Sequence, residues 1–236
     1  MNPTISRLAL RALVGQRRGL VLLALPLLLI ALAATVQMIT GEPVHGHGIL
    51  IEVGLGIVVP VVALLAANGV LGPEIDDGSV VYLLSTPVSR YTVALSKWVT
   101  AAGVSVVLSA GGLAVAALAG GLDSGWVLGS AVAGAIGALL YTALFAALSA
   151  ATRHGMIAGL VYVLIIEGAM GSLLSGLRYI SVQSITQRLA EAASELDLRS
   201  TDMGLGYAVV AAVVVLVGGV VFAGWRLQRF QLRGDE

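Results

Sequence analysis

Six apolar stretches, each long enough to cross a membrane as a helix, constrain this chain more than any other feature. About 20 mostly apolar residues are needed for a helix to cross roughly 30 Å of hydrocarbon. A helix satisfies its own backbone hydrogen bonds there, and the runs lack the alternation of a β-barrel. The sequence therefore predicts an all-α integral membrane protein, with residues 1–236 forming a single transmembrane domain of six spans. The predicted spans are Leu20–Ile39, Ile49–Leu71, Trp98–Gly120, Trp126–Ala150, Met156–Leu177 and Gly204–Trp225.

The amino-acid composition agrees with this fold class. Hydrophobic residues make up 58% of the chain and charged residues 11%, against about 45–50% and about 25% in soluble domains. One core of this size cannot bury that excess, so the surrounding solvent must itself be apolar. The chain contains no cysteine, which excludes disulfides, thiolate zinc sites and cysteine nucleophiles. Thirteen basic residues balance thirteen acidic ones, which leaves no basic face for nucleic acid.

The basic residues are divided unequally between the two sides of the predicted membrane domain. Lys and Arg near span ends favour the cytoplasm. Three of them, Arg178, Arg188 and Arg199, lie in the segment before the last span, and the other ten lie on the side of the termini. The sequence thus predicts a protein of the inner or plasma membrane with both termini in the cytoplasm. The ten are Arg7, Arg11, Arg17, Arg18, Arg90, Lys97, Arg153, Arg226, Arg229 and Arg233.

A further short helix is predicted before the first span. Apolar residues between Ile5 and Leu13 recur at helical spacing, with Arg7 and Arg11 on another face. This pattern is typical of a helix that lies in the membrane interface with its arginines among lipid headgroups.

Small and polar residues within the spans predict close contacts between helices. Gly155 and Gly159, like Gly125 and Gly129, have the spacing that lets two helices approach. In a chain with 30 glycines such matches are nearly expected by chance, so they are interpreted as packing. The polar residues expected to bond across helices are Gln37, Asn68, Thr142, Ser149, Ser172 and Ser175.

The segment 72–97, between the second and third spans, carries the most information. Gly72 and Pro73 predict the end of the preceding helix, and Gly78 with Ser79 predicts a turn and the start of a short helix. That short helix has an apolar stripe and ends at Pro87. A protein partner or the lipid interface could cover the stripe, and the composition does not separate the two. Ser89 can cap the next helix. The acidic residues of the segment are Glu74, Asp76 and Asp77, and the apolar stripe consists of Val80, Val81, Leu83 and Leu84.

The run Glu74-x-x-x-Gly78-Ser79-x-x-x-Leu83-Leu84-Ser85-x-Pro87-Val88-Ser89-Arg90 resembles the signature of the type-two ATP-binding-cassette (ABC-2) permeases. These are membrane subunits of drug, antibiotic and polysaccharide exporters. The family plan also has an interfacial helix, six spans, a cytoplasmic coupling helix after span two and an external helical segment after span five. The family often has Thr where this chain has Ser79, and both residues can cap a helix. The resemblance assigns ATPase coupling to Glu74, Gly78, Leu83, Leu84, Pro87, Val88 and Arg90.

The same resemblance implies the partners of the chain. A working unit would hold twelve spans, from two identical or two related permeases, above two copies of an ATPase subunit. The chain itself cannot be the motor, because no P-loop glycines precede its one lysine, Lys97. ATP and Mg²⁺ would therefore be bound by the ATPase, and this chain would need no cofactor. The resemblance implies export, and an apolar path with few charges suggests a small amphipathic or lipid-like substrate.

The external segment 178–203 is predicted to contain an amphipathic helix. Its apolar positions repeat at helical spacing, and Arg188, Glu191 and Glu195 lie on the other side. Such a helix could lie on the outer leaflet or cap an exit path, or it could serve packing alone. In the resembling family this region forms short re-entrant or surface helices beside the outlet. The apolar positions are Ile185, Leu189, Ala192, Ala193 and Leu196.

Glu167 is the most unusual single residue, because it falls near the middle of the predicted fifth span. A charged side chain at the centre of a bilayer costs on the order of 2.5–3.5 kcal/mol. Glu167 is therefore a candidate contact for substrate or a cation along the transport path. The alternative is a protonated acid hydrogen-bonded between helices. Glu52 is a weaker candidate for a functional role. It lies in the first turn of span two, where water and the positive N-terminal end of the helix both stabilise a charged carboxylate.

Other classes of function have less support in the sequence. His45 and His47 with Glu42 make an incomplete metal site, so no metal site is predicted. The chain has no motif of an intramembrane protease, and no catalytic residue is predicted. Two alternatives stay open: a proton-coupled secondary carrier that uses Glu167, and a non-transporting membrane assembly subunit.

Overall fold

The computed structural model describes residues 17–76, 90–152, 154–169, 179–194, 198 and 203–229, and in these ranges the chain folds into helices joined by turns. No strand occurs among the described residues, so the all-α prediction is confirmed. The elements are α2 (Arg17–Thr40), η1 (His47–Val58), α3 (Val59–Asp76), α5 (Arg90–Ala119), α6 (Ser124–Ala151), α7 (Gly155–Tyr162), η2 (Val163–Ala169), α9 (Val182–Ser194) and α10 (Leu205–Arg229). The π-helix η1 continues directly into α3, and α7 into η2.

Five helices in the described ranges are long and apolar enough to cross a membrane. They match five of the six predicted spans and are Gly19–Thr40, His47–Val70, Leu95–Ala119, Ser124–Ala151 and Leu205–Arg226. The predicted span Met156–Leu177 corresponds to a shorter apolar helix, Gly155–Gly168. Residues 170–177 of that span lie outside the described part of the chain, as do the interfacial helix and the segment 77–89.

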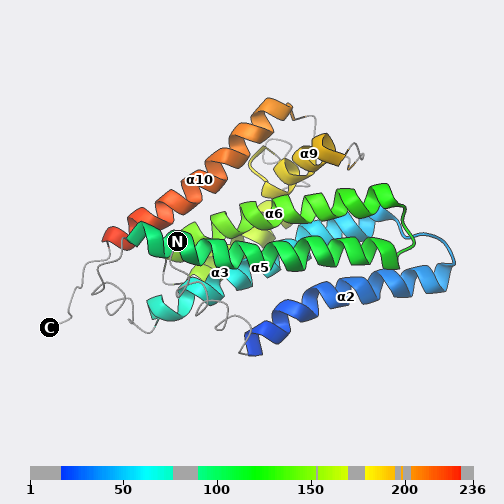
Figure 1. The fold of residues 1–236 in the computed structure, drawn as a ribbon, viewed down its shortest axis with the longest axis horizontal. Coiled ribbons are helices and arrows are strands. Elements are labelled where there is room, and N and C mark those ends of the chain that lie inside the picture. The colour runs from blue at the N-terminus through cyan, green and yellow to red at the C-terminus, as the bar shows by residue number, and fades with distance from the viewer. Residues whose placement is uncertain are drawn as a thin grey trace.

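α6 is the centre of the bundle (Figure 1), since it packs against α3, α5, α7, α9 and α10. Two of its aromatic side chains, Tyr141 and Phe145, are fully buried and stack with ring centroids 5.7 Å apart. Close approach depends on glycine: a Cβ atom on Gly134 would lie 2.8 Å from the carbonyl oxygen of Ser109 on α5. Likewise, a Cβ atom on Gly219 of α10 would lie 2.6 Å from the carbonyl oxygen of Ala143 on α6. Small residues therefore bring two neighbouring helices against the backbone of α6.

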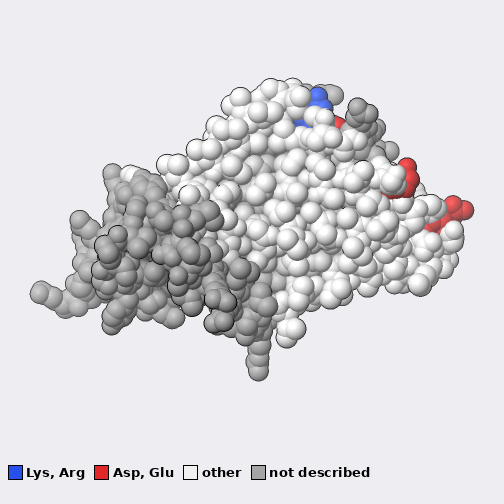
Figure 2. Space-filling view, in the orientation of Figure 1, with Lys and Arg blue, Asp and Glu red and all other residues white. Residues whose placement is uncertain are grey.

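The outer surface has the character of a protein immersed in hydrocarbon. Only 6% of the 18-residue apolar stretch in α10 is buried inside the protein. Val210 and Val214 of this helix are each 63% exposed. Figure 2 shows a described surface almost without charge, with acidic side chains at the end where α2 leads to η1 and α5 leads to α6. Glu42 and Asp123, both exposed, belong to these two turns. This distribution supports a multi-pass membrane protein.

The predicted helix end at Gly72 and Pro73 is wrong, because α3 continues through both residues to Asp76. A proline within a helix removes one backbone donor but keeps a helical φ, and neighbouring helices in a membrane can satisfy the freed carbonyl groups. The next helix does begin where expected, since α5 starts at Arg90, directly after Ser89.

The predictions about polar and small residues are confirmed in part. The Ser149 hydroxyl of α6 donates to the Asn68 side-chain oxygen of α3 at 3.0 Å, so these two residues do bond across helices. Thr142 instead donates to the carbonyl oxygen of Ala138 in its own helix, at 2.7 Å. Gly155 and Gly159 are both buried, and a Cβ atom on Gly159 would lie 2.2 Å from the Leu64 side chain.

Candidate functional site

The structure describes the two ends of the predicted coupling segment, residues 72–97, which belong to α3 and α5. Glu74 lies in the last turn of α3 and Arg90 is the first residue of α5. These two helices pack against each other, and both pack against α6. The other predicted coupling residues lie outside the described residues, and they are Gly78, Leu83, Leu84, Pro87 and Val88.

Glu167, in the last turn of η2, accepts hydrogen bonds from four groups. The Tyr162 hydroxyl lies 3.2 Å from Oε1 and the Ser181 hydroxyl 2.5 Å from Oε2. The backbone N–H groups of Val182 and Gln183 donate to Oε1 at 3.0 and 3.4 Å. The carboxyl group of Glu167 is thus surrounded by donors of its own chain, which come from α7 and from the beginning of α9.

The contacts of Glu167 form a cap on α9. Val182 and Gln183 are the first two residues of this helix, and the first N–H groups of a helix have no partner within it. The helix dipole makes that end positive, which favours a carboxylate beside it. Ser181 completes the cap, because its hydroxyl oxygen also accepts the N–H of Ser184 at 3.1 Å. A side chain from the preceding apolar helix therefore holds the N-terminus of α9 in place.

An aromatic chain positions the donor on α7. The ring of Phe145 on α6 meets the ring of Tyr162 edge-on, with centroids 6.3 Å apart. Phe145 itself stacks on the buried Tyr141. Because these rings come from the central helix, the Tyr162 hydroxyl reaches Glu167 from a packed position.

The first turn of α9 lies among the spans. The side-chain amide of Gln183 donates to the Ile51 carbonyl oxygen of η1 at 3.4 Å. Gly56 leaves room for this side chain, since its would-be Cβ atom lies 3.2 Å from the Gln183 nitrogen. On the other side, Thr186 is fully buried against Gly137 of α6. The beginning of α9 is thereby inserted between η1 and α6.

The prediction of an apolar face on α9 is confirmed for the first half of the helix. Ile185 is buried and Leu189 packs on the core, as the spacing predicted. Ala192 and Ala193 are exposed, contrary to that prediction. The buried face turns instead through Val182, Ile185, Thr186 and Ala190, because the helix contacts α6 and α10 rather than a flat lipid surface.

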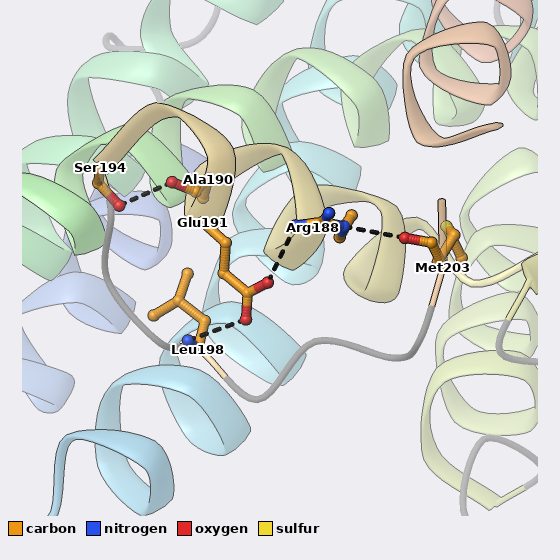
Figure 3. A network of polar contacts seen from close by, with 6 residues as sticks. All are labelled: Arg188, Ala190, Glu191, Ser194, Leu198 and Met203. Carbon is orange, nitrogen blue, oxygen red and sulfur yellow. Dashed lines mark hydrogen bonds and ion pairs between the residues drawn. The ribbon is translucent and has the colours of Figure 1, made fainter. Parts of the chain in front are cut away.

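The polar face of α9 contacts Leu198 and Met203, two residues that follow the helix (Figure 3). The Arg188 Nε group donates to the Met203 carbonyl oxygen at 2.9 Å, and its guanidinium lies 3.6 Å from the Glu191 carboxylate. Glu191 also accepts the backbone N–H of Leu198 at 3.0 Å. Leu198 and Met203 are both buried. Arg188 and Glu191, predicted to lie on the polar side, thus hold Met203 and Leu198 beside α9.

The Glu191 contact predicts a local change in backbone protection. In Glu191→Ala the buried Leu198 N–H loses an acceptor, which costs about 1–3 kcal/mol. We expect the Leu198 amide to exchange its hydrogen about tenfold faster or more. Glu191→Gln keeps an acceptor oxygen and serves as the control. Equal exchange of this amide in the wild-type and alanine proteins would contradict the role of Glu191.

Reasoning from the sequence missed the partners of Glu167. Ser181 directly before an amphipathic run is a recognisable helix-cap signal. Nothing in the sequence, however, joins that cap to a carboxylate that precedes it by 14 residues. Glu52, the weaker candidate, is exposed on η1. His47 lies edge-on to the Trp126 ring at 5.2 Å, and no three potential metal ligands cluster among the described residues.

A known protein family matches most of the chain. Residues 18–183 match the family model described as ABC-2 family transporter protein. The matched range runs from the first turn of α2 to Gln183 in α9, and it includes the segment 77–89 and Glu167. A comparison with curated protein sequences finds no significant match. The chain therefore belongs to the ABC-2 family of transporter proteins and is a membrane permease component of an ABC transporter.

Proposed function

We propose that this chain is the membrane-spanning subunit of an ATP-driven exporter and forms half of its translocation path. A second permease, identical or related, completes the path, and two copies of a separate ATPase subunit bind ATP and Mg²⁺ on the cytoplasmic side. Both termini face that side. The family match and the few charges on the face shown in Figure 2 support this proposal. The substrate class is a small amphipathic or lipid-like molecule.

The observation that carries the coupling proposal is the packing of α3 and α5. These helices precede and follow the segment 77–89, they contact each other, and both contact the central helix α6. A displacement of the segment by the ATPase would consequently act on the middle of the bundle rather than on its edge.

Charge placed on the coupling segment should separate the permease from its ATPase. In the double variant Leu84→Asp with Arg90→Asp, an apolar contact becomes acidic and a cation is inverted. We expect the yield of co-purified ATPase to fall tenfold or more, measured by quantitative mass spectrometry of nanodisc complexes.

Ser79→Thr is the control for that experiment, because threonine can also cap a helix. It should recover the ATPase in the wild-type ratio. Normal assembly and normal nucleotide hydrolysis in the double variant would refute the coupling assignment. Recovery of the wild-type permease with no ATPase, in repeated mild preparations, would favour a proton-coupled carrier or an assembly subunit.

Within this proposal Glu167 serves first to position α9 rather than to bind a cation. Its two oxygens accept from four donors of the chain itself. A cation would have to compete with backbone N–H groups that point at the same oxygens. In a proton-coupled carrier that used Glu167, protonation would weaken the hydrogen bonds that hold the N-terminus of α9 at each transport cycle. The path beside α9 can still contact the substrate through the neighbouring side chains.

A further inference from the structure

Lys97 makes a contact that none of the roles described so far uses. It is the one lysine of the chain, it lies on α5, and its side chain is 4% exposed. Its Nζ atom donates to the Val70 carbonyl oxygen of α3 at 3.1 Å. The contact therefore joins two helices at residues 27 positions apart in the chain.

The position of this contact relates it to the coupling segment. The candidate span His47–Val70 ends at Val70, and the next span, Leu95–Ala119, begins two residues before Lys97. Both residues thus lie at the ends of their spans that are nearest to residues 77–89. A lysine near a span end usually extends its amine toward water. Here the amine is turned to a backbone carbonyl of the neighbouring helix, with the Val70 side chain also buried.

The carbonyl that Lys97 binds lies where α3 is intrinsically weakest. Pro73 has no backbone N–H, so the Gly69 carbonyl loses its helical donor. Gly69 and Gly72 each lower helix stability further, by about 1 kcal/mol relative to alanine. A hydrogen bond from a charged amine is about twice as strong as one between neutral groups. Lys97 therefore supports α3 from outside at the point where it would bend most easily.

We propose that Lys97 is a positioning residue for coupling, which ties α3 to α5 so that the two helices flanking residues 77–89 move as one unit. This inference rests on the proposed function. Without the tie, a displacement of the segment would bend α3 between Gly69 and Pro73 and leave α5 and the bundle in place. ATP would then be hydrolysed without a full movement of the spans.

The test uses the permease–ATPase complex in nanodiscs and hydrogen–deuterium exchange. In Lys97→Met, which keeps the length of the side chain but removes its charge and donors, the amides of residues 66–76 should exchange about tenfold faster. Lys97→Arg can donate to the same carbonyl and should restore the wild-type rate. Thr100→Val is the matched control, since Thr100 is buried one turn further along α5 and donates to Ser96 of its own helix at 2.9 Å.

Trapping the ATPase with ATP and vanadate tests whether its movement reaches the far end of the membrane spans. In the wild-type complex we expect the trapped state to change exchange in η1 and in residues 107–115, at the far end of the bundle. In Lys97→Met that change should be lost while ATPase binding and ATP hydrolysis persist, and Lys97→Arg should recover it. A wild-type response in Lys97→Met would overturn the inference. If the wild-type complex itself shows no such response, the proposed function fails, and faster exchange of residues 66–76 in Lys97→Met would then establish a local tie only.

Discussion

Glu167→Ala is expected to release the N-terminus of α9 from the bundle. The substitution removes the acceptor of the Val182 and Gln183 N–H groups and of the Ser181 hydroxyl. Each buried donor left without a partner costs about 1–3 kcal/mol. The natural absence of cysteine allows a direct measurement, because cysteines introduced at Gly56 and Gln183 would be the two thiols of the chain, at positions where a Cβ atom on Gly56 would lie 3.2 Å from the end of the Gln183 side chain. We expect oxidative cross-linking of this pair to fall severalfold in Glu167→Ala.

Two further variants separate the anchoring role of Glu167 from general packing. Glu167→Gln keeps one side-chain oxygen as an acceptor and should give intermediate cross-linking. Tyr162→Phe removes only the 3.2 Å hydrogen bond to the carboxyl group and should change the yield little. Unchanged cross-linking in Glu167→Ala would show that the other contacts of α9 suffice to hold its N-terminus.

Gly134→Ala is expected to destabilise the whole bundle, although it adds one methyl group. Its Cβ atom would lie 2.8 Å from the Ser109 carbonyl oxygen and 2.9 Å from the Leu113 side chain. Since the backbone of α5 cannot yield as a side-chain end can, α5 and α6 must move apart, at a cost of about 1–3 kcal/mol. The apparent Tm in detergent and the yield of monodisperse protein should both fall.

Gly111→Ala is the matched control for that substitution. Gly111 lies on α5 with no atom within 4 Å of its would-be Cβ atom. There alanine gains helix propensity, about 1 kcal/mol, at no steric cost. The two variants should therefore shift the Tm in opposite directions. A similar fall in both would mean that general glycine flexibility, rather than close contact, determines stability.

The sequence predicts the spans well because hydrocarbon selects for the length and polarity of a helix, and both can be counted in the chain. It does not predict which face of a span is covered, since nearly every side chain is apolar. Gly134 and Gly111 look alike in the sequence, yet one touches a backbone carbonyl and the other touches nothing. Only the paths of neighbouring helices decide this difference.

At the candidate site, too, the sequence predicts which residue is unusual but not which groups contact it. Glu167 is conspicuous in the sequence, because a carboxylate within an apolar run is costly wherever it lies. Its partners could not be predicted, since two of them are backbone N–H groups of a helix that begins 15 residues later. The break predicted at Gly72 and Pro73 failed for a related reason. A local rule about proline ignores neighbouring helices, here α5, whose Lys97 donates to the Val70 carbonyl oxygen of α3.

The central place of α6 has a consequence for how the protein is made. Synthesis delivers α2, η1, α3 and α5 to the membrane before α6, so the buried hydroxyls of Ser105 and Ser109 on α5 first meet lipid or the insertion machinery. The core can close only after about residue 151 has been inserted, when α6 covers that face. A nascent chain that ends in the turn at Asp123 thus leaves this face of α5 without the helix that covers it in the finished bundle.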